Sequence, residues 1–150
     1  MREHIHQSNL IENIDDLSAD RQSLKAWRWL EKQVGLNSHT ICELQRRIVK
    51  TQDTLTYEQR GRFRTVHVTV GGRVCPSPYM ITHLMNNWLL DYRGREPLVN
   101  HIAFEKIHPF VDGNGRTGRM LLWWQQIQNG EEPTLFKASE KYEKYYPLFR

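Results

Sequence analysis

Residues 108–119 have the sequence HPFVDGNGRTGR. These twelve residues bring together one imidazole, one carboxylate, three glycines and two guanidinium groups. A hydrophobic core has no use for such a mixture, because charged side chains are rarely buried unless they are paired. A site that binds a phosphate uses all of these groups, since glycines admit the anion and guanidinium groups neutralise it. The stretch therefore predicts an anion-binding active site.

The stretch is expected to join two helices. An apolar pattern over residues 97–107 favours a first helix, and Pro109 disfavours helical backbone at His108. A loop over about 109–114 is expected to follow, with a second helix from about Gly115. The free N–H groups and the positive dipole end of that second helix would attract an anion before any side chain is counted.

Five residues of the stretch are predicted to hold a polyphosphate. Gly113 and Gly115 let the backbone approach a phosphate closely and adopt positive φ, and Asn114 tolerates such conformations. Arg116 and Arg119 lie three residues apart on the expected helix, so both can reach one polyphosphate.

Two further side chains add chemistry to this phosphate grip. Asp112 can hold Mg²⁺, which usually takes one or two carboxylates together with substrate phosphates. His108 has an ordinary pKa that suits removal of a proton near pH 7. Phe110 is expected to hold the loop against the core. The combination favours a function over a simple turn at a helix end.

Other motif interpretations fail on their context. Residues 113–118 satisfy the dinucleotide pattern G-x-G-x-x-G, but the preceding segment is helical and charged rather than a buried strand. No lysine follows the glycines as a P-loop requires. Cys42 and Cys75 have no CxxC partners, and His4 and His6 lie in a terminal segment, so no metal cluster is predicted.

The whole chain favours one domain. Its 150 residues are 39% hydrophobic and 25% charged, without repeats or low-complexity tracts. No apolar run is long enough to cross a bilayer and no signal-peptide core follows Met1, so we expect no membrane partner. Two cysteines and the missing signal favour a cytoplasmic location. The net charge of +4 is too mild and scattered to favour nucleic-acid binding.

Hydrophobic periodicity predicts an all-α domain of about seven helices with one β-hairpin. Residues 8–14 are expected to form a short helix that Ser8 caps, with Glu12 in solvent. Val66, Val68 and Val70 alternate with polar residues before Gly71-Gly72, which is typical of a hairpin. The remaining helices are expected from Ser18 to Gly35, from Thr40 through Ile48, from Pro78 to Arg93, over 97–107, from Gly115 to Asn129, and around Phe136 to Phe149.

The stretch 108–119 matches the signature H-x-F-x-D/E-G-N-G-R-x-x-R of Fic-domain proteins at all eight fixed positions. The order of helices, hairpin, helix, motif loop and helix also resembles that family. The resemblance covers nearly the whole chain. It implies a single Fic domain over residues 1–150, a helical fold whose hairpin is a flap.

The resemblance implies a protein adenylyltransferase, which transfers AMP from ATP to a Ser, Thr or Tyr hydroxyl of a target protein. His108 would be the base that deprotonates this hydroxyl. Asp112 would hold Mg²⁺ across the α- and β-phosphates. The segment Gly113-Asn114-Gly115 would form the anion hole, and Arg116 and Arg119 would neutralise the β- and γ-phosphates. Phosphorylating relatives carry a lysine at the position of Gly115, so its retention favours AMP transfer.

The flap of the family holds the target by strand pairing. By resemblance, its contact edge here would be Thr65, Val66, His67 and Val68. From the residues alone, a solvated strand residue is the more common interpretation of His67.

The resemblance also revises the interpretation of the N-terminal segment. Many Fic proteins carry an inhibitory helix with the pattern S/T-x-x-x-E-G/N, and the residues from Ser8 to Asn13 fit it. Glu12 would then pair with Arg119 and block productive placement of the γ-phosphate. The inhibitory helix is accordingly expected at about residues 8–14.

Several alternatives stay open at this level. A hydrolase that removes AMP, a transferase of another nucleotide and a nucleotide-binding regulatory module without turnover use similar residues. The target protein and the choice between a monomer and a homodimer are not determined. Tyr142 and Tyr145 could line an adenine pocket, but core packing is more common for aromatic residues at that spacing.

Overall fold

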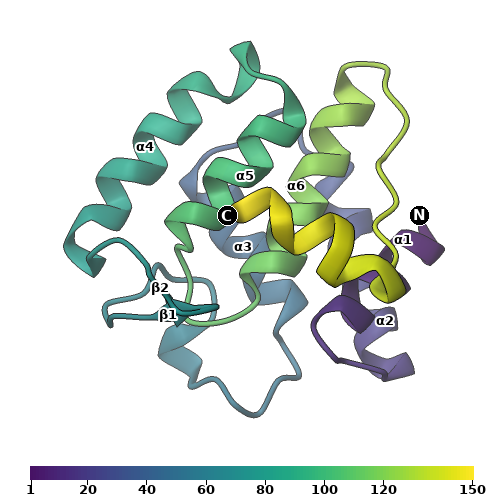
Figure 1. Ribbon diagram of the computed structural model, residues 1–150, viewed down its shortest axis with the longest axis horizontal. Helices are drawn as coiled ribbons and strands as arrows, with labels where there is room; N and C mark the ends of the chain where they lie inside the picture. The colour runs from purple at the N-terminus through teal and green to yellow at the C-terminus, as the bar shows by residue number, and fades with distance from the viewer.

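The computed structural model describes residues 1–150 as a bundle of six α-helices with one hairpin (Figure 1). The helices are α1 (Arg2–Ile11), α2 (Leu17–Leu30), α3 (Ser38–Ile48), α4 (Ile81–Asp91), α5 (Pro97–Ile107) and α6 (Asn114–Gln128). The strands are β1 (Thr69–Val70) and β2 (Arg73–Val74). Short helical turns lie at Tyr57–Gln59, Pro78–Met80, Tyr92–Gly94 and along Ala138–Phe149. The predicted all-α architecture with one hairpin is confirmed.

Helix α6 lies in the middle of the bundle and contacts α5, α3 and α1. Its residues are buried almost all round, as expected for a helix enclosed by its neighbours. Trp123 packs edge-on against Trp27 of α2, with ring centroids 6.3 Å apart. Phe110, just before α6, lies 5.6 Å from the Phe63 ring and 6.5 Å from the Phe104 ring. The motif is therefore anchored in the core at both of its ends.

The hairpin is shorter than the valine pattern predicts. Thr69 pairs with Val74 and Val70 with Arg73, and the turn glycines between them both have positive φ. Beyond this ladder a single bond, from the Cys75 N–H to the Val68 carbonyl at 3.1 Å, continues the pairing. A two-stranded ribbon without a third strand has little to extend it. The segment from Thr65 to Val68 therefore precedes the paired strand.

The N-terminal helix begins six residues earlier than predicted. Met1 is its N-cap, so Ser8 lies inside α1 and does not cap it. The helix ends at Ile11, Glu12 is the C-cap residue, and Asn13 has a left-handed φ of 60°. The prediction placed the start too late because Ser8 resembles a capping residue. In the structure a buried face, carrying Ile5 and Ser8, instead holds the earlier turns against the bundle.

The expected helix around Phe136 to Phe149 is a chain of short turns. Ala138–Glu140 and Tyr146–Phe149 are 3₁₀ turns, and Lys141–Tyr145 is a π turn. Pro147 explains the break before the last turn, because proline lacks an N–H and its ring clashes with the preceding helical turn. This C-terminal segment, yellow in Figure 1, crosses in front of α6 and reaches α1. Lys141 Nζ donates to the Ile11 carbonyl at 3.1 Å and to Asn13 Oδ1 at 2.7 Å.

None of the helices combines the length and the apolar character that crossing a membrane requires.

Candidate active site

His108 occupies a sharp exit from α5. The helix ends at Ile107, and His108 adopts a left-handed conformation with φ 51° and ψ 62°. Few residues other than glycine adopt this conformation. Burial lowers the pKa of His108 to about 4, and the positive charges of Arg64 and Arg73 act in the same direction. The imidazole is therefore neutral near pH 7, the state in which it can accept a proton.

The loop after His108 is held by the side chain of Asn114. Its amide accepts from the Phe110 N–H and donates to the Phe110 carbonyl, both at 2.9 Å. Gly113 precedes it as the N-cap of α6, with a left-handed φ of 79°. A Cβ at Gly113 would lie 2.7 Å from Val49 Cγ1, so both the space and the backbone favour glycine. The predicted loop-to-helix junction is confirmed, although α6 begins at Asn114.

Asp112 and Arg116 lie at the more open end of the site. The Asp112 side chain is 47% exposed, and its carboxylate accepts hydrogen bonds from the Gly113 N–H and the Gln52 amide. Arg116 is nearly buried, and its Nη2 donates to Gln52 Oε1 at 2.7 Å and lies 3.9 Å from Asp112 Oδ1. Gln52 thus bridges both residues. Sequence analysis missed Gln52, because its polar segment has no periodicity or motif that marks one residue.

The residues around Asp112 fit a magnesium ion only in company with a substrate. No group of three or more His, Cys, Asp or Glu side chains is positioned to hold a metal. A single half-exposed carboxylate suits Mg²⁺, which commonly takes one or two protein ligands and completes its shell with phosphates and water. Asp112 is the residue that would hold such an ion.

Arg119 lies at the opposite, closed end of the site. Its side chain is 0% exposed, and its hydrogen-bond partners come from α1 with its C-cap and from the C-terminal segment. The guanidinium donates to Ser8 Oγ at 2.8 Å, to the Ser8 carbonyl at 2.9 Å and to Glu12 Oε1 at 2.6 Å. Its Nη1 donates to the Tyr145 hydroxyl at 2.7 Å. The structure therefore brings Glu12 to Arg119, as the resemblance implies, and adds Ser8 as a second partner.

The Glu12 carboxylate lies over the first turn of α6. A Cβ placed on Gly115 would overlap Glu12 Oε1, so the glycine is what allows this close approach. Burial acts to raise the pKa of Glu12, but Arg119 and, more weakly, Arg116 and His108 bring the pKa below its usual value. An ionised carboxylate thus occupies a position where α6 favours an anion. The expectation of Glu12 in solvent is met in part, because its side chain is 35% exposed while its carboxylate binds Arg119.

A buried polar cluster supports Arg119 from behind. The Tyr145 hydroxyl lies 3.1 Å from His101 Nε2, and burial raises the pKa of Glu105 to about 8. A Cβ on Gly118 would lie 3.1 Å from His101 Nδ1, so this glycine lets α5 and α6 pack closely. Sequence analysis gave no role to His101 and Glu105, although their i, i+4 spacing places them on one face of α5. The core packing favoured for Tyr145 is confirmed by its 3% exposure, whereas Tyr142 is exposed.

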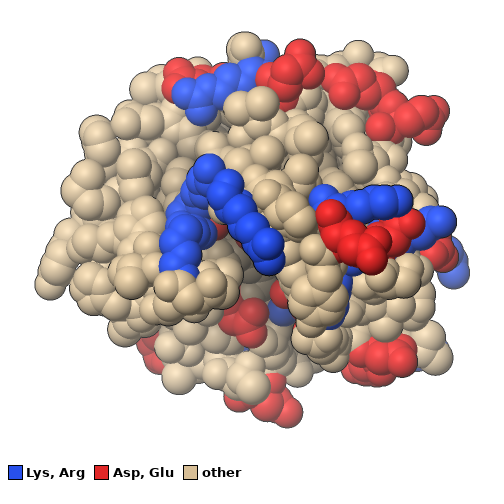
Figure 2. All heavy atoms as spheres, viewed as in Figure 1, with Lys and Arg blue, Asp and Glu red and all other residues tan.

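The positive charge of the site lies inside the molecule rather than on its surface. Both motif arginines are buried. In Figure 2, basic side chains stand near the centre of the view, and acidic and basic side chains meet over the C-terminal segment. No stripe of one sign covers this face. An anion would therefore be selected by the enclosed guanidinium groups and by the start of α6.

The predicted flap residues lie beside the motif but do not belong to it. Thr65, Val66 and His67 are exposed, and Val68 is half-buried. Within this segment the Val66 carbonyl accepts from Arg64 Nη1 and the Val68 carbonyl from the Cys75 N–H, whereas the backbone of Thr65 and His67 makes no hydrogen bond. Whether they form the contact edge stays a prediction.

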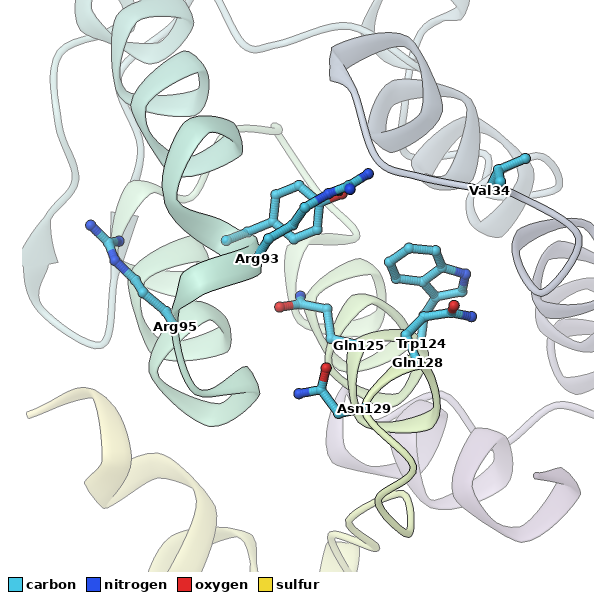
Figure 3. A pocket seen from close by; sticks show the side chains of 8 residues that line it. Val34, Arg93, Arg95, Trp124, Gln125, Gln128 and Asn129 are labelled. Carbon is cyan, nitrogen blue, oxygen red and sulfur yellow. The ribbon is translucent and has the colours of Figure 1, made fainter.

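A cavity of about 200 Å³ lies elsewhere, against the far end of α6. Figure 3 shows Trp124 and Gln125 of α6 lining it together with the C-cap residue Asn129, with Arg93 on the facing wall. Helix α6 has 15 residues, and a rise of about 1.5 Å per residue separates its two ends by roughly 20 Å. This cavity is therefore distinct from the motif site.

Comparison with known proteins agrees with this geometry. The model of the Fic/DOC family matches residues 35–126. The protein adenylyltransferase Fic of Drosophila willistoni is 33% identical over an alignment of 130 residues that covers 81% of this chain and 25% of that protein.

Solved structures show the same fold. Fic-1 (aa134–508) from C. elegans superposes with a TM-score of 0.80 at 19% identity, over 98% of this chain and 54% of that chain. The BepC protein with bound AMPPNP from Bartonella tribocorum gives a TM-score of 0.56 at 14% identity, over 81% of this chain and 69% of that chain.

The chain belongs to the Fic/DOC family. It spans about a quarter of the length of the curated relatives that it matches.

Proposed function

We propose that this chain is a protein adenylyltransferase that transfers AMP from ATP to a hydroxyl side chain of a target protein. One observation carries the proposal: a neutral, half-buried His108 stands at the same helix junction as two enclosed guanidinium groups. The relatives named protein adenylyltransferase and the relative solved with AMPPNP support it.

The reaction requires a base, an electrophile and a stabilised leaving group. His108 accepts the proton of the target hydroxyl, and the resulting oxygen attacks the α-phosphorus of ATP. The bond from the α-phosphorus to its bridging oxygen breaks, AMP stays on the target, and pyrophosphate leaves. Arg116 and Arg119 neutralise the charge of the leaving group, and the first N–H groups of α6 bind phosphate oxygens. Gly113, Asn114 and Gly115 supply this backbone.

A divalent cation completes the charge balance. When bound, Mg²⁺ supplies positive charge to the phosphates, and Asp112 would hold it. Arg116 lies next to Asp112 and orients the phosphate end of the nucleotide.

The proposal includes inhibition by the chain's own N-terminus. The Glu12 carboxylate lies against Gly115 and takes one N–H of Arg119. A γ-phosphate that reached Arg119 would meet this negative charge at close range, which is unfavourable in a buried site. Ser8 holds two further N–H groups of the same arginine, and Asn13 secures the helix end through Lys141. The Glu12 carboxylate must therefore leave Arg119 before this arginine can bind the γ-phosphate.

The test uses ATP labelled at the α-phosphate, a cell lysate as the source of target, and the Glu12→Gly protein. Labelled protein bands that appear with the Glu12→Gly protein, and are lost when His108 is also replaced, support the transferase function. Nucleotide binding without any label would instead indicate a regulatory module. Parallel reactions with CTP, GTP and UTP test whether another nucleotide is the substrate. A labelled target returned to the Glu12 protein tests whether this state removes AMP.

A further inference from the structure

Arg64 is a buried cation that lies between the hairpin and His108. Its residue is only 2% exposed, and its guanidinium contacts backbone carbonyls rather than a carboxylate. Nε donates to the His108 carbonyl at 2.7 Å, Nη1 to the Val66 carbonyl at 2.9 Å and Nη2 to the Pro76 carbonyl at 2.7 Å. One side chain therefore joins the exit of α5 to both ends of the hairpin.

The backbone of Arg64 strengthens the same connection. Its N–H donates to the Pro109 carbonyl at 2.8 Å. Residue 64 thus binds two consecutive carbonyls, those of His108 and Pro109. Figure 1 shows the loop from α5 to α6 passing beside the hairpin, where these contacts are made.

These contacts act on a strained backbone. His108 has a left-handed φ of 51°, a conformation that persists in a non-glycine residue only when its surroundings hold it. The bond from Arg64 Nε sets the direction of the His108 carbonyl, and the Pro109 bond sets the next peptide. Together they determine where the imidazole stands.

A purely structural role explains these contacts less well. Burial lowers the pKa of Arg64, which shows that its charge is costly at this position. An apolar side chain of similar length would fill the same space without that cost. What an apolar residue lacks is a planar fork that reaches three carbonyls in fixed directions. Lysine lacks this fork as well.

We propose that Arg64 is a positioning residue that sets the place of the base His108 relative to the segment that receives the target. This inference rests on the proposed transferase function, in which the hairpin segment presents the target hydroxyl. Arg64 touches no reacting group and acts through the two segments that it joins. The guanidinium therefore determines how well the hydroxyl meets the imidazole, whereas nucleotide binding depends on residues 112–119.

The experiment compares Arg64→Ala with Arg62→Ala, both in the Glu12→Gly protein. Arg62 is exposed two residues earlier and makes no hydrogen bond through its side chain, so it is a matched control. We expect Arg64→Ala to lower AMP transfer about 10- to 100-fold, the loss expected from a misplacement of about 1 Å. ATP affinity, measured by calorimetry, is expected to stay within about twofold of the parent. Arg62→Ala is expected to match the parent in both measurements.

Chemical rescue separates positioning from folding. Methylguanidinium at low millimolar concentration is expected to restore transfer by Arg64→Ala at least about fivefold, whereas methylammonium at equal ionic strength restores none, because only the planar fork reaches three carbonyls. Transfer within twofold of the parent, a parallel loss of ATP affinity, or equal rescue by both cations would overturn the proposal. If Arg64→Ala does not fold, Arg64→Lys replaces it. Lysine should lower transfer about tenfold at unchanged ATP affinity.

AMP transfer by the Glu12→Gly protein itself tests the proposed function separately from the role of Arg64. If Glu12→Gly transfers no AMP, the proposed function fails, and NMR still tests the position of His108. Arg64→Ala should then shift the His108 and Val66 amide resonances together, and methylguanidinium should shift both back. Unchanged His108 resonances would contradict the positioning role even in that case.

Discussion

Arg116 and Arg119 lie three residues apart on α6 and are both buried, but the chain treats them differently. Arg119 has four hydrogen bonds to its own chain, and the pKa of its guanidinium is raised despite burial because Tyr145 and Glu12 lie against it. Burial lowers the pKa of Arg116, whose Nε has no partner and whose neighbour Asp112 is 3.9 Å away.

Under the proposed function, the difference separates two tasks in phosphate binding. A buried guanidinium with unused N–H groups gains most from an incoming anion, because those groups are otherwise unsatisfied. Arg116 therefore has an N–H group that is available to bind an anion. Arg119 has to exchange Glu12 for a ligand, so its binding depends on the state of α1.

The largest effect is expected from removing His108, the proposed general base. His108→Ala in the Glu12→Gly protein should lower AMP transfer about 10²- to 10⁴-fold, the usual contribution of a general base. Labelled AMP incorporation measures this loss. ATP binding should persist in calorimetry, since His108 contributes no phosphate contact. Residual transfer above one tenth of the parent would contradict the role of His108.

Replacing the less satisfied arginine should have the next largest effect. Arg116→Met in the Glu12→Gly protein removes the charge with a similar stem, and we expect transfer to fall about 10²-fold through lost phosphate stabilisation. Arg116→Lys should recover only part of this loss, because lysine lacks the planar fork. Steady-state rates at saturating ATP measure both variants. Full recovery by lysine would show that charge alone matters.

Opening the grip at Arg119 should raise activity. Glu12→Gly is expected to increase AMP transfer about 10- to 100-fold, the range of common coupling energies between sites. Glu12→Gln keeps the shape of the side chain but removes its charge, so it should activate less. Band labelling with the three proteins under identical conditions gives the order. Equal activity of all three would remove Glu12 from the regulation.

A smaller effect is expected at the partner on the C-terminal segment. Tyr145→Phe removes one hydrogen bond to Arg119 and keeps the ring, which lies 5.0 Å from the guanidinium carbon. The free energy of unfolding should fall by about 1 kcal/mol. Urea denaturation measures this change. AMP transfer should rise only a few-fold, because Glu12 remains bound to Arg119. A rise as large as that of Glu12→Gly would show that Tyr145, rather than Glu12, is the inhibitory contact.

The smallest effect is expected from pH. The folded pKa of His108 is about 4, below the ordinary value of 6.5, so its neutral, proton-accepting form is complete above about pH 5. Transfer by the Glu12→Gly protein should therefore be flat between pH 6 and 8 and fall only as the pH approaches 4. A pH–rate profile with a midpoint near 6.5 would show that the half-buried histidine titrates like an exposed one.

The local sequence was sufficient for the motif and its junction. Pro109 ends α5 near His108 and glycine permits the positive φ at Gly113, so the place of the loop follows from residue type, whereas the left-handed φ of His108 depends on its surroundings. The hairpin turn at Gly71-Gly72 follows for the same reason. The extents of α1 and of the C-terminal segment could not be predicted from local residues. Burial against other elements decides where α1 begins, and Pro147 breaks the C-terminal segment before its last turn.

The sequence by itself determined the chemical groups of the site and the fold class, because periodicity and special backbone residues act over short distances. It also marked Glu12 and Arg119 as partners, but only through resemblance. The tertiary structure decided which side chains become the hydrogen-bond partners of the motif. Gln52, Arg64 and Tyr145 come from segments far from residues 108–119 in the chain, and no local pattern distinguishes them. Their roles arise from the packing of the whole bundle, which brings these segments to the two ends of one motif.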